Sequence, residues 1–317
     1  MKKTITNGYL FVILASLGFS AKSVLVKVGY TYGADAESLM LLRVSIALPL
    51  VFFALLAMES LRGFRINTKD LFLHALVGGG GLGCAMLFSF YSLSVMDASV
   101  SVLVIFTYPA ITVLLLLLLG RERRIRYVLA PLALTFTGLL MALRIDSSSI
   151  FSANLEGTIY GLISAFSFAT YNVMSKRLLR NSSPIRTTAF STTFVVCFMV
   201  AVYTLQHSGN LSAMTNQILN LTPEIWVISF VLALFSGFLP FLFFLYGIEI
   251  LGAGRTVIIS SVGPVFTILW AGIFLGERLD TVQVTGMIVV VVGIVALKLT
   301  GTKKDKKTEE EKTLDTN

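Results

Sequence analysis

Long apolar runs separated by short polar connectors make up most of this sequence. A helix needs about 20 apolar residues to cross a hydrocarbon layer about 30 Å thick. Ten runs meet or approach that length, at residues 8–28, 37–58, 71–93, 98–119, 126–143, 157–178, 187–206, 225–248, 253–275 and 282–299. We therefore predict an all-α integral membrane protein with ten transmembrane helices.

The composition supports a membrane protein and excludes several other classes. Hydrophobic residues make up 56% of the chain and charged residues 13%, whereas a soluble domain carries about 25% charged residues. Two cysteines and two histidines are too few for a disulfide framework or a histidine-based metal site. We therefore expect no cofactor and no metal, and we expect the lipid bilayer and a small-molecule substrate as partners.

The net charge of +8 is distributed in a way that argues against nucleic-acid binding. Lys and Arg form short clusters between apolar runs and in the last residues. If the N-terminus is cytoplasmic, 20 of the 25 Lys and Arg residues fall on the cytoplasmic side, as positively charged inner loops require. We predict a multi-pass protein of the cell (inner or plasma) membrane with both termini in the cytoplasm, and a disordered cytoplasmic tail at 301–317.

The two halves of the chain resemble each other at a constant offset. Moving the fourth run forward by 155 residues places Ala98 on Ala253 and Pro109 on Pro264. Extended beyond the run, the same offset places Tyr91 on Tyr246, Glu122 on Glu277 and Arg123 on Arg278. This predicts two repeats of five helices, at 1–148 and 149–300. Five crossings are an odd number, so the second repeat enters the membrane from the opposite side. Inverted repeats of this kind enclose a central cavity near the midplane, which favours a transporter that works by alternating access.

Several short motifs resemble the EamA-type branch of the drug/metabolite transporter family. They are Leu-Leu-Arg-Val-Ser-Ile-Ala at 41–47, Tyr-Pro at 108–109 followed by Gly-Arg-Glu-Arg at 120–123, and Gly-Pro at 263–264 followed by Leu-Gly-Glu-Arg at 275–278. The resemblance implies ten helices, two inverted repeats, cytoplasmic termini, and export or exchange of small metabolites, often amino acids or related compounds. Arg121 departs from the pattern, because it separates the glycine from the glutamate in the first copy.

Two cations lie inside predicted helices. Lys22 and Arg43 lie about 9 Å from the outer ends of their helices, at 1.5 Å per residue. A buried cation costs about 2.5–3.5 kcal/mol on insertion scales, so snorkelling toward the headgroups is the favoured interpretation for Lys22. For Arg43, binding to helix-end carbonyls and binding to substrate are equally supported. No acidic residue lies at a comparable depth, which favours an anionic or carboxylate-bearing substrate and argues against carboxylate-mediated proton coupling.

Other polar side chains within the runs complete the candidate site. Serines in membrane helices usually permit close packing, so packing is the first interpretation for each serine alone; for Tyr171 and Asn172, packing and cavity lining are equally supported. The candidate substrate-binding residues are Ser20, Lys22, Ser23, Arg43, Tyr91, Tyr108, Tyr171, Asn172, Tyr246, Ser260 and Ser261.

Proline and glycine mark three positions where a helix can depart from regular geometry. Pro109 and Pro264 each remove one helical hydrogen bond, and a simple kink is the expected result. The four glycines at 78–81 permit either a tight helix contact or local unwinding, and contact is the expected result.

Two alternatives to a small-solute transporter stay open. A flippase for a lipid-linked substrate would share this architecture. An integral-membrane enzyme is the more distant alternative, because neither H-E-x-x-H nor G-x-S-x-G occurs. The chain has no G-x-x-x-x-G-K-[ST] loop for ATP, so solute gradients are the expected source of energy.

Overall fold

The computed structural model describes residues 2–64, 66–96, 98–120, 126–142, 154–206, 218–275, 281–293 and 295–296. Every regular element within these ranges is helical, which confirms the prediction of an all-α protein. The predicted tail at 301–317 and the Glu-Arg motifs at 122–123 and 277–278 lie outside the described residues.

The first half of the chain contains α1 (Lys2–Ser20), α2 (Lys22–Thr31), α3 (Ala36–Glu59), η1 (Ser60–Phe64), α4 (Thr68–His74), η2 (Ala75–Gly83), α5 (Cys84–Val95), α6 (Ala98–Ile105), α7 (Tyr108–Leu118) and α8 (Arg126–Ala142). The second half contains α10 (Leu155–Leu178), α11 (Pro184–Gln206), α13 (Pro223–Ala233), η3 (Leu234–Phe238), α14 (Leu239–Leu251), α15 (Ala253–Ser260) and α16 (Gly263–Leu275), followed by a helix at Thr281–Gly293. η2 and η3 are π-helical.

Six helical stretches in the described part are long and apolar enough to cross a bilayer: Ile5–Thr31, Ala36–Glu59, Thr68–Val95, Val100–Leu118, Pro184–Gln206 and Pro223–Leu251. They coincide with six of the ten predicted runs. α10 has 24 residues but carries more polar side chains than these six. The protein is therefore a multi-pass membrane protein.

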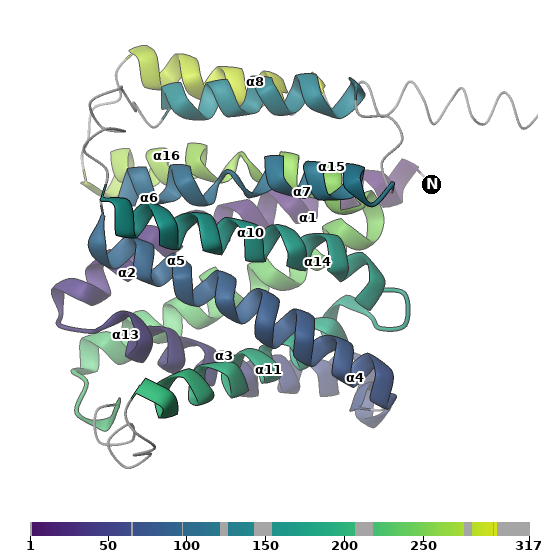
Figure 1. Cartoon of the computed structure of the whole chain (residues 1–317), viewed down its shortest axis with the longest axis vertical. Coiled ribbons are helices and arrows are strands. Elements are labelled where there is room, and N and C mark those ends of the chain that lie inside the picture. Colours follow the sequence, from purple (N-terminus) through teal and green to yellow (C-terminus); the bar gives the residue numbers. More distant parts are fainter. Residues whose placement is uncertain are drawn as a thin grey trace, which may run out of the picture.

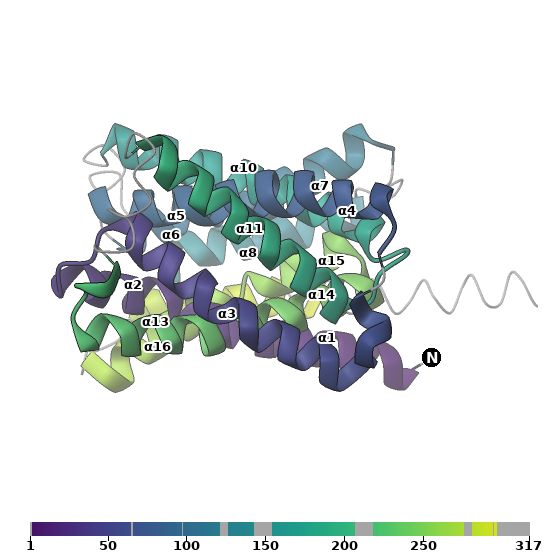
Figure 2. The ribbon, with the colours of Figure 1, turned by 90° about the horizontal axis from the view of Figure 1, so that it is seen from below.

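The helices form two layers, which Figure 2 shows edge-on. One layer contains α5, α6, α7 and α10, and the other contains α1, α13, α14 and α16. α3 and α11 lie along one edge of both layers, and α8 lies at the opposite edge (Figure 1). Helices of one half pack on helices of the other in matching pairs. α10 packs on α5 as α1 packs on α14, and α11 packs on η2 as α3 packs on α13.

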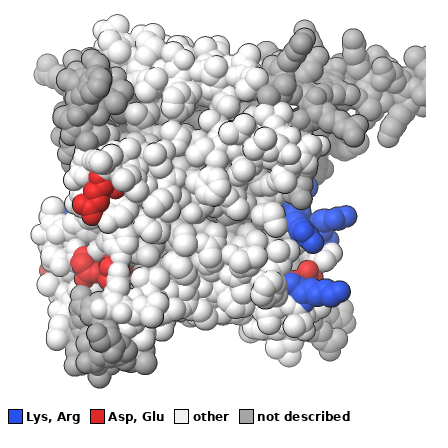
Figure 3. Space-filling view, viewed as in Figure 1, with Lys and Arg blue, Asp and Glu red and all other residues white. Residues whose placement is uncertain are grey.

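The two ends of the bundle differ in charge. We call them the Asp70 end, which includes the α10–α11 connection and the N-terminus, and the Tyr91 end, which includes the α5–α6 and α2–α3 connections. On the face seen in Figure 3, Lys and Arg gather at the Asp70 end, and most Asp and Glu lie at the opposite end. Lys176, Arg177, Arg180 and Arg255 surround a hollow of about 690 Å³ at the Asp70 end.

Two helices are broken at equivalent positions. Turn residues 106–107 separate α6 from α7, and turn residues 261–262, which lie 155 positions later, separate α15 from α16. Pro109 and Pro264 are each the second residue of the segment that follows the break. The structure thus has a break where the sequence predicted a kink, because proline fits the first turn of a new helix. Other boundaries keep the same offset: α4 starts at Thr68 and α13 at Pro223.

α8 and the helix at Thr281–Gly293 pack through two glycines. A Cβ atom on Gly138 would lie 2.6 Å from Val290 N and 2.8 Å from Gly286 O, and one on Gly293 would lie 3.1 Å from Thr135 N. The earlier residue of α8, Thr135, thus contacts the later residue of the second helix, Gly293, whereas Gly138 contacts Gly286 and Val290. The two helices therefore run antiparallel. The interface is also reciprocal, because Gly138 and Thr135 correspond to Gly293 and Val290 at the 155-residue offset.

Candidate functional site

A cavity of about 110 Å³ lies between the two layers and is lined by residues of both halves of the chain. Six aromatic rings contribute to its wall: Phe19, Phe90, Phe106, Tyr108, Phe168 and Phe241. Its polar side chains are Ser20, Lys22, Arg43, Ser89, Tyr108, Ser164 and Thr267. The cavity is therefore mainly apolar, with a few polar groups that can orient a ligand.

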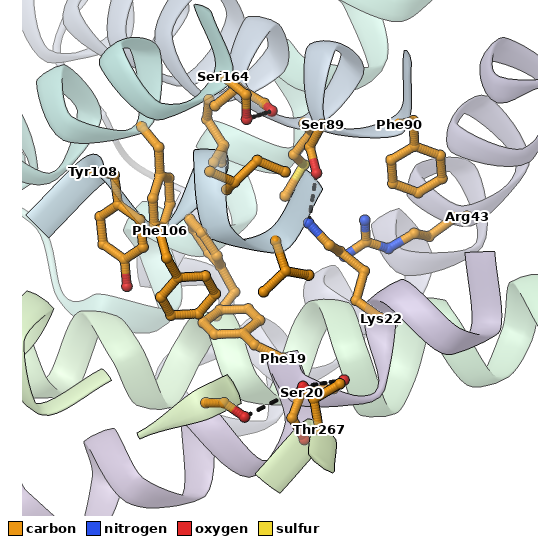
Figure 4. Close-up of a pocket in the computed structure, with 18 residues that line it drawn as sticks. Phe19, Ser20, Lys22, Arg43, Ser89, Phe90, Phe106, Tyr108, Ser164 and Thr267 are labelled. Atoms are coloured by element: carbon orange, nitrogen blue, oxygen red, sulfur yellow. Dashed lines mark hydrogen bonds between the residues drawn. The ribbon is translucent and has the colours of Figure 1, made fainter. Parts of the chain in front are cut away.

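Lys22 points into this cavity. The first predicted span is interrupted at Ala21, and Lys22 begins α2. Its Nζ donates a 2.7 Å hydrogen bond to Ser89 Oγ on α5, as Figure 4 shows. The favoured prediction that Lys22 snorkels toward the outer headgroups is therefore wrong, because the break at Ala21 and the α5 serine provide a polar partner inside the bundle.

Arg43 binds backbone carbonyls, which is one of its two predicted roles, and one of its nitrogens is left to bind a substrate. It is 3% exposed, and its Nη2 donates to Ser236 O at 2.9 Å while its Nε donates to Leu232 O at 3.4 Å. These carbonyls belong to η3 and to the preceding turn of α13, where the π-helical register changes the regular bonding. Arg43 Nη1 is buried without a hydrogen-bond partner. An anion in the adjoining cavity would satisfy it.

The charge of the cavity is positive among the residues that the structure describes. Its lining contains two cationic side chains and no carboxylate. Glu37 accepts a hydrogen bond from Tyr91 at one end of the bundle, and Glu59 forms a salt bridge with Arg186 at the other. Neither carboxylate neutralises the cavity, so an anionic group would be attracted into it.

The two helix breaks meet beside the cavity. The hydroxyl groups of Tyr108, at the start of α7, and Ser260, at the end of α15, share a hydrogen bond. The Tyr108 ring also packs edge-on against Phe168, with 4.9 Å between the ring centroids. The predicted residues Tyr108 and Ser260 are thus brought together, and they join the two halves of the chain.

Ser20 takes part in another contact between the two halves. It lines the cavity, and its Oγ accepts a 3.0 Å hydrogen bond from Trp270 Nε1. Thr267 Oγ1 donates to Ser20 O at 3.1 Å. α1 and α16 are therefore bonded to each other where both contact the cavity.

The other predicted residues lie outside this lining. Ser23 is buried, and Ser261 bonds to Val257 O. Tyr91 bonds to Glu37 and to Gln206 at the Tyr91 end. Tyr246 stacks on Phe11, with 5.1 Å between the ring centroids.

Tyr171 and Asn172 are fully buried on the Asp70 side of the cavity. Both polar atoms of the Asn172 side chain have no hydrogen-bond partner, whereas the Tyr171 hydroxyl faces those of Ser191 and Ser175. The Tyr171 ring packs against Phe168 and Phe241, which line the cavity. These two residues thus lie directly behind the cavity wall.

Several lining residues are not among the candidates predicted from the sequence, including Ser89, Ser164 and all five phenylalanines. Their types are common in membrane helices, and only the rotation of each helix in the bundle distinguishes a lining residue from a lipid-facing one. In the described ranges, no group of three or more His, Cys, Asp or Glu side chains is placed to hold a metal ion.

Comparison with known proteins places this fold in a family. The sequence profile of the EamA-like transporter family matches twice, at residues 6–144 and 155–299. The uncharacterized transporter YcbK of Bacillus subtilis (strain 168) is 29% identical over 311 residues, covering 94% of this chain and 96% of that protein. The uncharacterized transporter sll1319 of Synechocystis sp. (strain ATCC 27184 / PCC 6803 / Kazusa) is 24% identical over 314 residues, covering 92% of both chains.

A solved crystal structure shares the fold. It superposes with a TM-score of 0.72 and 18% sequence identity, covering 94% of this chain and 98% of that one. The similarity therefore extends over the whole helical bundle.

Proposed function

The chain belongs to the EamA-like transporter family, and we propose that it is a secondary transporter that exports or exchanges a small carboxylate-bearing metabolite across the cytoplasmic membrane. The observation that carries this proposal is the pair Lys22 and Arg43 in an aromatic cavity that no described carboxylate lines. The unpartnered Arg43 Nη1 supplies a donor for the carboxylate.

The shape of the lining indicates what accompanies the carboxylate. Apolar and aromatic side chains cover most of the wall, and the six rings offer faces for stacking. A hydrophobic or aromatic amino acid, or a related acid, fits this combination. A highly polar solute such as a sugar would leave its hydroxyl groups facing apolar side chains, which is costly.

Alternating access is supported by the relation between the two halves. Helix starts and helix breaks repeat at an offset of 155 residues, and so do the contacts of Gly138 with Val290 and of Gly293 with Thr135. The equivalent helices α8 and Thr281–Gly293 run antiparallel, as a two-fold axis in the membrane plane requires. We propose two inverted five-helix repeats, at 1–148 and 149–300, which rock about the cavity and expose it to each face in turn.

Solute gradients would supply the energy for this cycle. A carboxylate in the middle of a membrane helix is a common proton site in proton-coupled transporters. The cavity lining offers only cations and hydroxyl groups in the described residues. We therefore propose facilitated diffusion or exchange, with the substrate carboxylate as the partner of the two cations.

Uptake by proteoliposomes tests this proposal. The purified full chain is reconstituted and supplied with radiolabelled amino acids, other carboxylates and matched neutral amides. We expect Arg43→Gln and Lys22→Gln to lower carboxylate uptake at least about tenfold, since a charged hydrogen bond contributes about 1.5–3 kcal/mol. Lys27→Gln is the matched control, because Lys27 bonds to Met96 O outside the cavity lining.

Two results would contradict the proposal. Equal losses for carboxylates and amides would show that the cations do not bind the carboxylate. Movement of labelled lipid between leaflets, without uptake of any member of the panel, would show a flippase instead.

A further inference from the structure

Buried polar atoms without hydrogen-bond partners are confined to a few helices in the described structure. On α4, α10 and α11 they belong to His74, Asn172 and Thr187. On α3, α13 and η3 they belong to Ser38, Arg43, Ser229 and Ser236. A buried polar atom without a partner costs about 1–3 kcal/mol. Its repeated occurrence at these helices needs a physical reason.

Ordinary helix packing does not supply that reason. Serine and threonine in membrane helices usually bond to the carbonyl one turn earlier. Ser175, Thr188 and Thr193 all do so, at 2.7–2.9 Å. Thr187, on the same helix as Thr188 and Thr193, does not, and the Ser191 hydroxyl instead faces that of Tyr171 on α10. The hydroxyl groups of Thr187 and Ser191 are therefore not held by the carbonyls of their own helix.

The two sets occupy equivalent interfaces. α11 packs on η2, and α3 packs on α13, which leads into η3. α4 with η2 and α13 with η3 correspond at the 155-residue offset, since they begin at Thr68 and Pro223. The α11–η2 interface extends from the cavity toward the Asp70 end, and the α3–α13 interface extends from Arg43 toward the Tyr91 end.

A second, smaller cavity adjoins the main one between α3, α11 and η3, and Leu82 of η2 contributes to its wall. It has a volume of about 20 Å³, and Arg43, Leu82, Met86 and Phe241 contribute to the walls of both cavities. Thr188 and Thr192 of α11 line only the smaller one. This volume is enough for about one water molecule. The two cavities therefore adjoin at these shared side chains.

The α11–η2 interface is closed by backbone contact. A Cβ atom on Gly78 would lie 2.8 Å from Ser191 Cα, and one on Gly79 would lie 3.1 Å from Phe194 O. η2 thus presents no side chain to α11 at these positions, so the surfaces can separate without withdrawing interlocked side chains. At the Asp70 end, Asn181 donates to Asp70 at 3.2 Å and Arg186 bonds to Glu59 at 2.6 Å.

We propose that the α11–η2 and α3–α13 interfaces open in turn during transport, and that they form the two halves of the solute pathway. In this proposal, the hydroxyl groups of Tyr171, Thr187 and Ser191 contact the solute carboxylate after it leaves Arg43. Ser229 and Ser38 contact the carboxylate in the corresponding half of the pathway, toward the Tyr91 end. The inference rests on the proposed transport function, and it adds the path to the binding cavity.

Modification of single cysteines tests the pathway. Cys84 and Cys197 are replaced by serine, and Ser191→Cys and Ser229→Cys are introduced one at a time into the full chain. The probe is a small, negatively charged methanethiosulfonate that does not cross membranes, applied to right-side-out or inside-out vesicles. Ser101→Cys is the matched control, because Ser101 is fully buried but its hydroxyl pairs with Ser92 at 2.8 Å.

An open state populated at about 1–10% gives modification at about 1–10% of the rate of an exposed cysteine such as Asn67→Cys. We expect Ser191→Cys and Ser229→Cys to react at such rates, each from a different face of the membrane, and Ser101→Cys to stay unmodified. The proposal is overturned if Ser191→Cys is as unreactive as Ser101→Cys in protein that transports solute, or if both test cysteines react from the same face.

The uptake assay separates this inference from the proposed substrate class. Reaction of the two cysteines from opposite faces, in protein that takes up no carboxylate, supports the pathway and contradicts the carboxylate. Carboxylate uptake with both cysteines unreactive supports the substrate class and overturns the pathway.

Discussion

Adding one methyl group at Gly78 should shift the transport cycle. The Cβ atom of Gly78→Ala would lie 2.8 Å from Ser191 Cα and 3.0 Å from Ser191 Cβ. Ordinary contacts of this kind are about 3.5–4.0 Å long. Because a backbone atom of α11 is involved, a side-chain rotation cannot relieve the overlap. The α11–η2 interface must move apart to admit the methyl group.

The size of the shift follows from the cost of overpacking. Inserting a methyl group into a packed interface costs about 1–3 kcal/mol. The cost applies only while the α11–η2 interface is closed, so it favours the open state. At about 1.4 kcal/mol per tenfold change, the ratio of open to closed protein rises about 5- to 140-fold. Uptake should fall, since the carrier must close this interface to expose the cavity to the opposite face.

The rate of modification of Ser191→Cys measures this population. From an open population of about 1–10%, we expect this rate to rise about 4- to 60-fold in the Gly78→Ala background. Gly80→Ala is the matched control within the same glycine run, because a Cβ atom there meets no atom within 4 Å. Equal modification and uptake rates in the two alanine variants would refute the reasoning. Gel filtration and thermal unfolding of both variants show whether Gly78→Ala keeps its fold.

Two further substitutions test the contacts between the halves. Gly138→Ala should destabilise the protein by about 1–3 kcal/mol, because the new methyl group meets backbone atoms of Val290 and Gly286; denaturant unfolding that matches wild type would contradict this. Tyr108→Phe removes the bond to Ser260, which keeps its bond to Val257 O, so we expect a loss of only about 0.6 kcal/mol. A loss above about 2 kcal/mol in the same assay would show that Tyr108 has a larger structural role.

The sequence predicted the helical class and the location of the long helices well. Bilayer thickness imposes a length and a composition on each span, and both can be read directly from the chain. The predicted run at 37–58 became α3 at Ala36–Glu59, and the run at 71–93 lies within Thr68–Val95. The resemblance to the EamA-type transporters is confirmed by the family match over both halves.

Which side chains point into the cavity could be predicted only in part. Ser20, Lys22, Arg43 and Tyr108 line the cavity, whereas Tyr91 and Tyr246 lie elsewhere although they match at the repeat offset. Helix rotation depends on the neighbouring helices, and the offset carries no information about it. Lys22 shows the same limit, because its orientation depends on the break at Ala21 and on Ser89 of a different helix.

The π-helices could not be predicted from the sequence pattern. Four successive glycines permit both regular and irregular backbone geometry, and the approach of α11 favours the π-helical one here. η3 contains a single glycine, Gly237, yet it adopts the same geometry. Its carbonyls bind Arg43, so a buried side chain supports a backbone form that the local residues do not specify.

The central claim is that two similar halves cross the membrane in opposite senses around one cavity. Asn67 and Thr222 test it most directly, because they lie 155 residues apart, precede the equivalent helices α4 and α13, and are both exposed. In intact cells, a maleimide that does not cross membranes should label Thr222→Cys, and it should label Asn67→Cys only after permeabilisation. Labelling of both cysteines in intact cells, or of neither, would place the two positions on the same face and contradict the account.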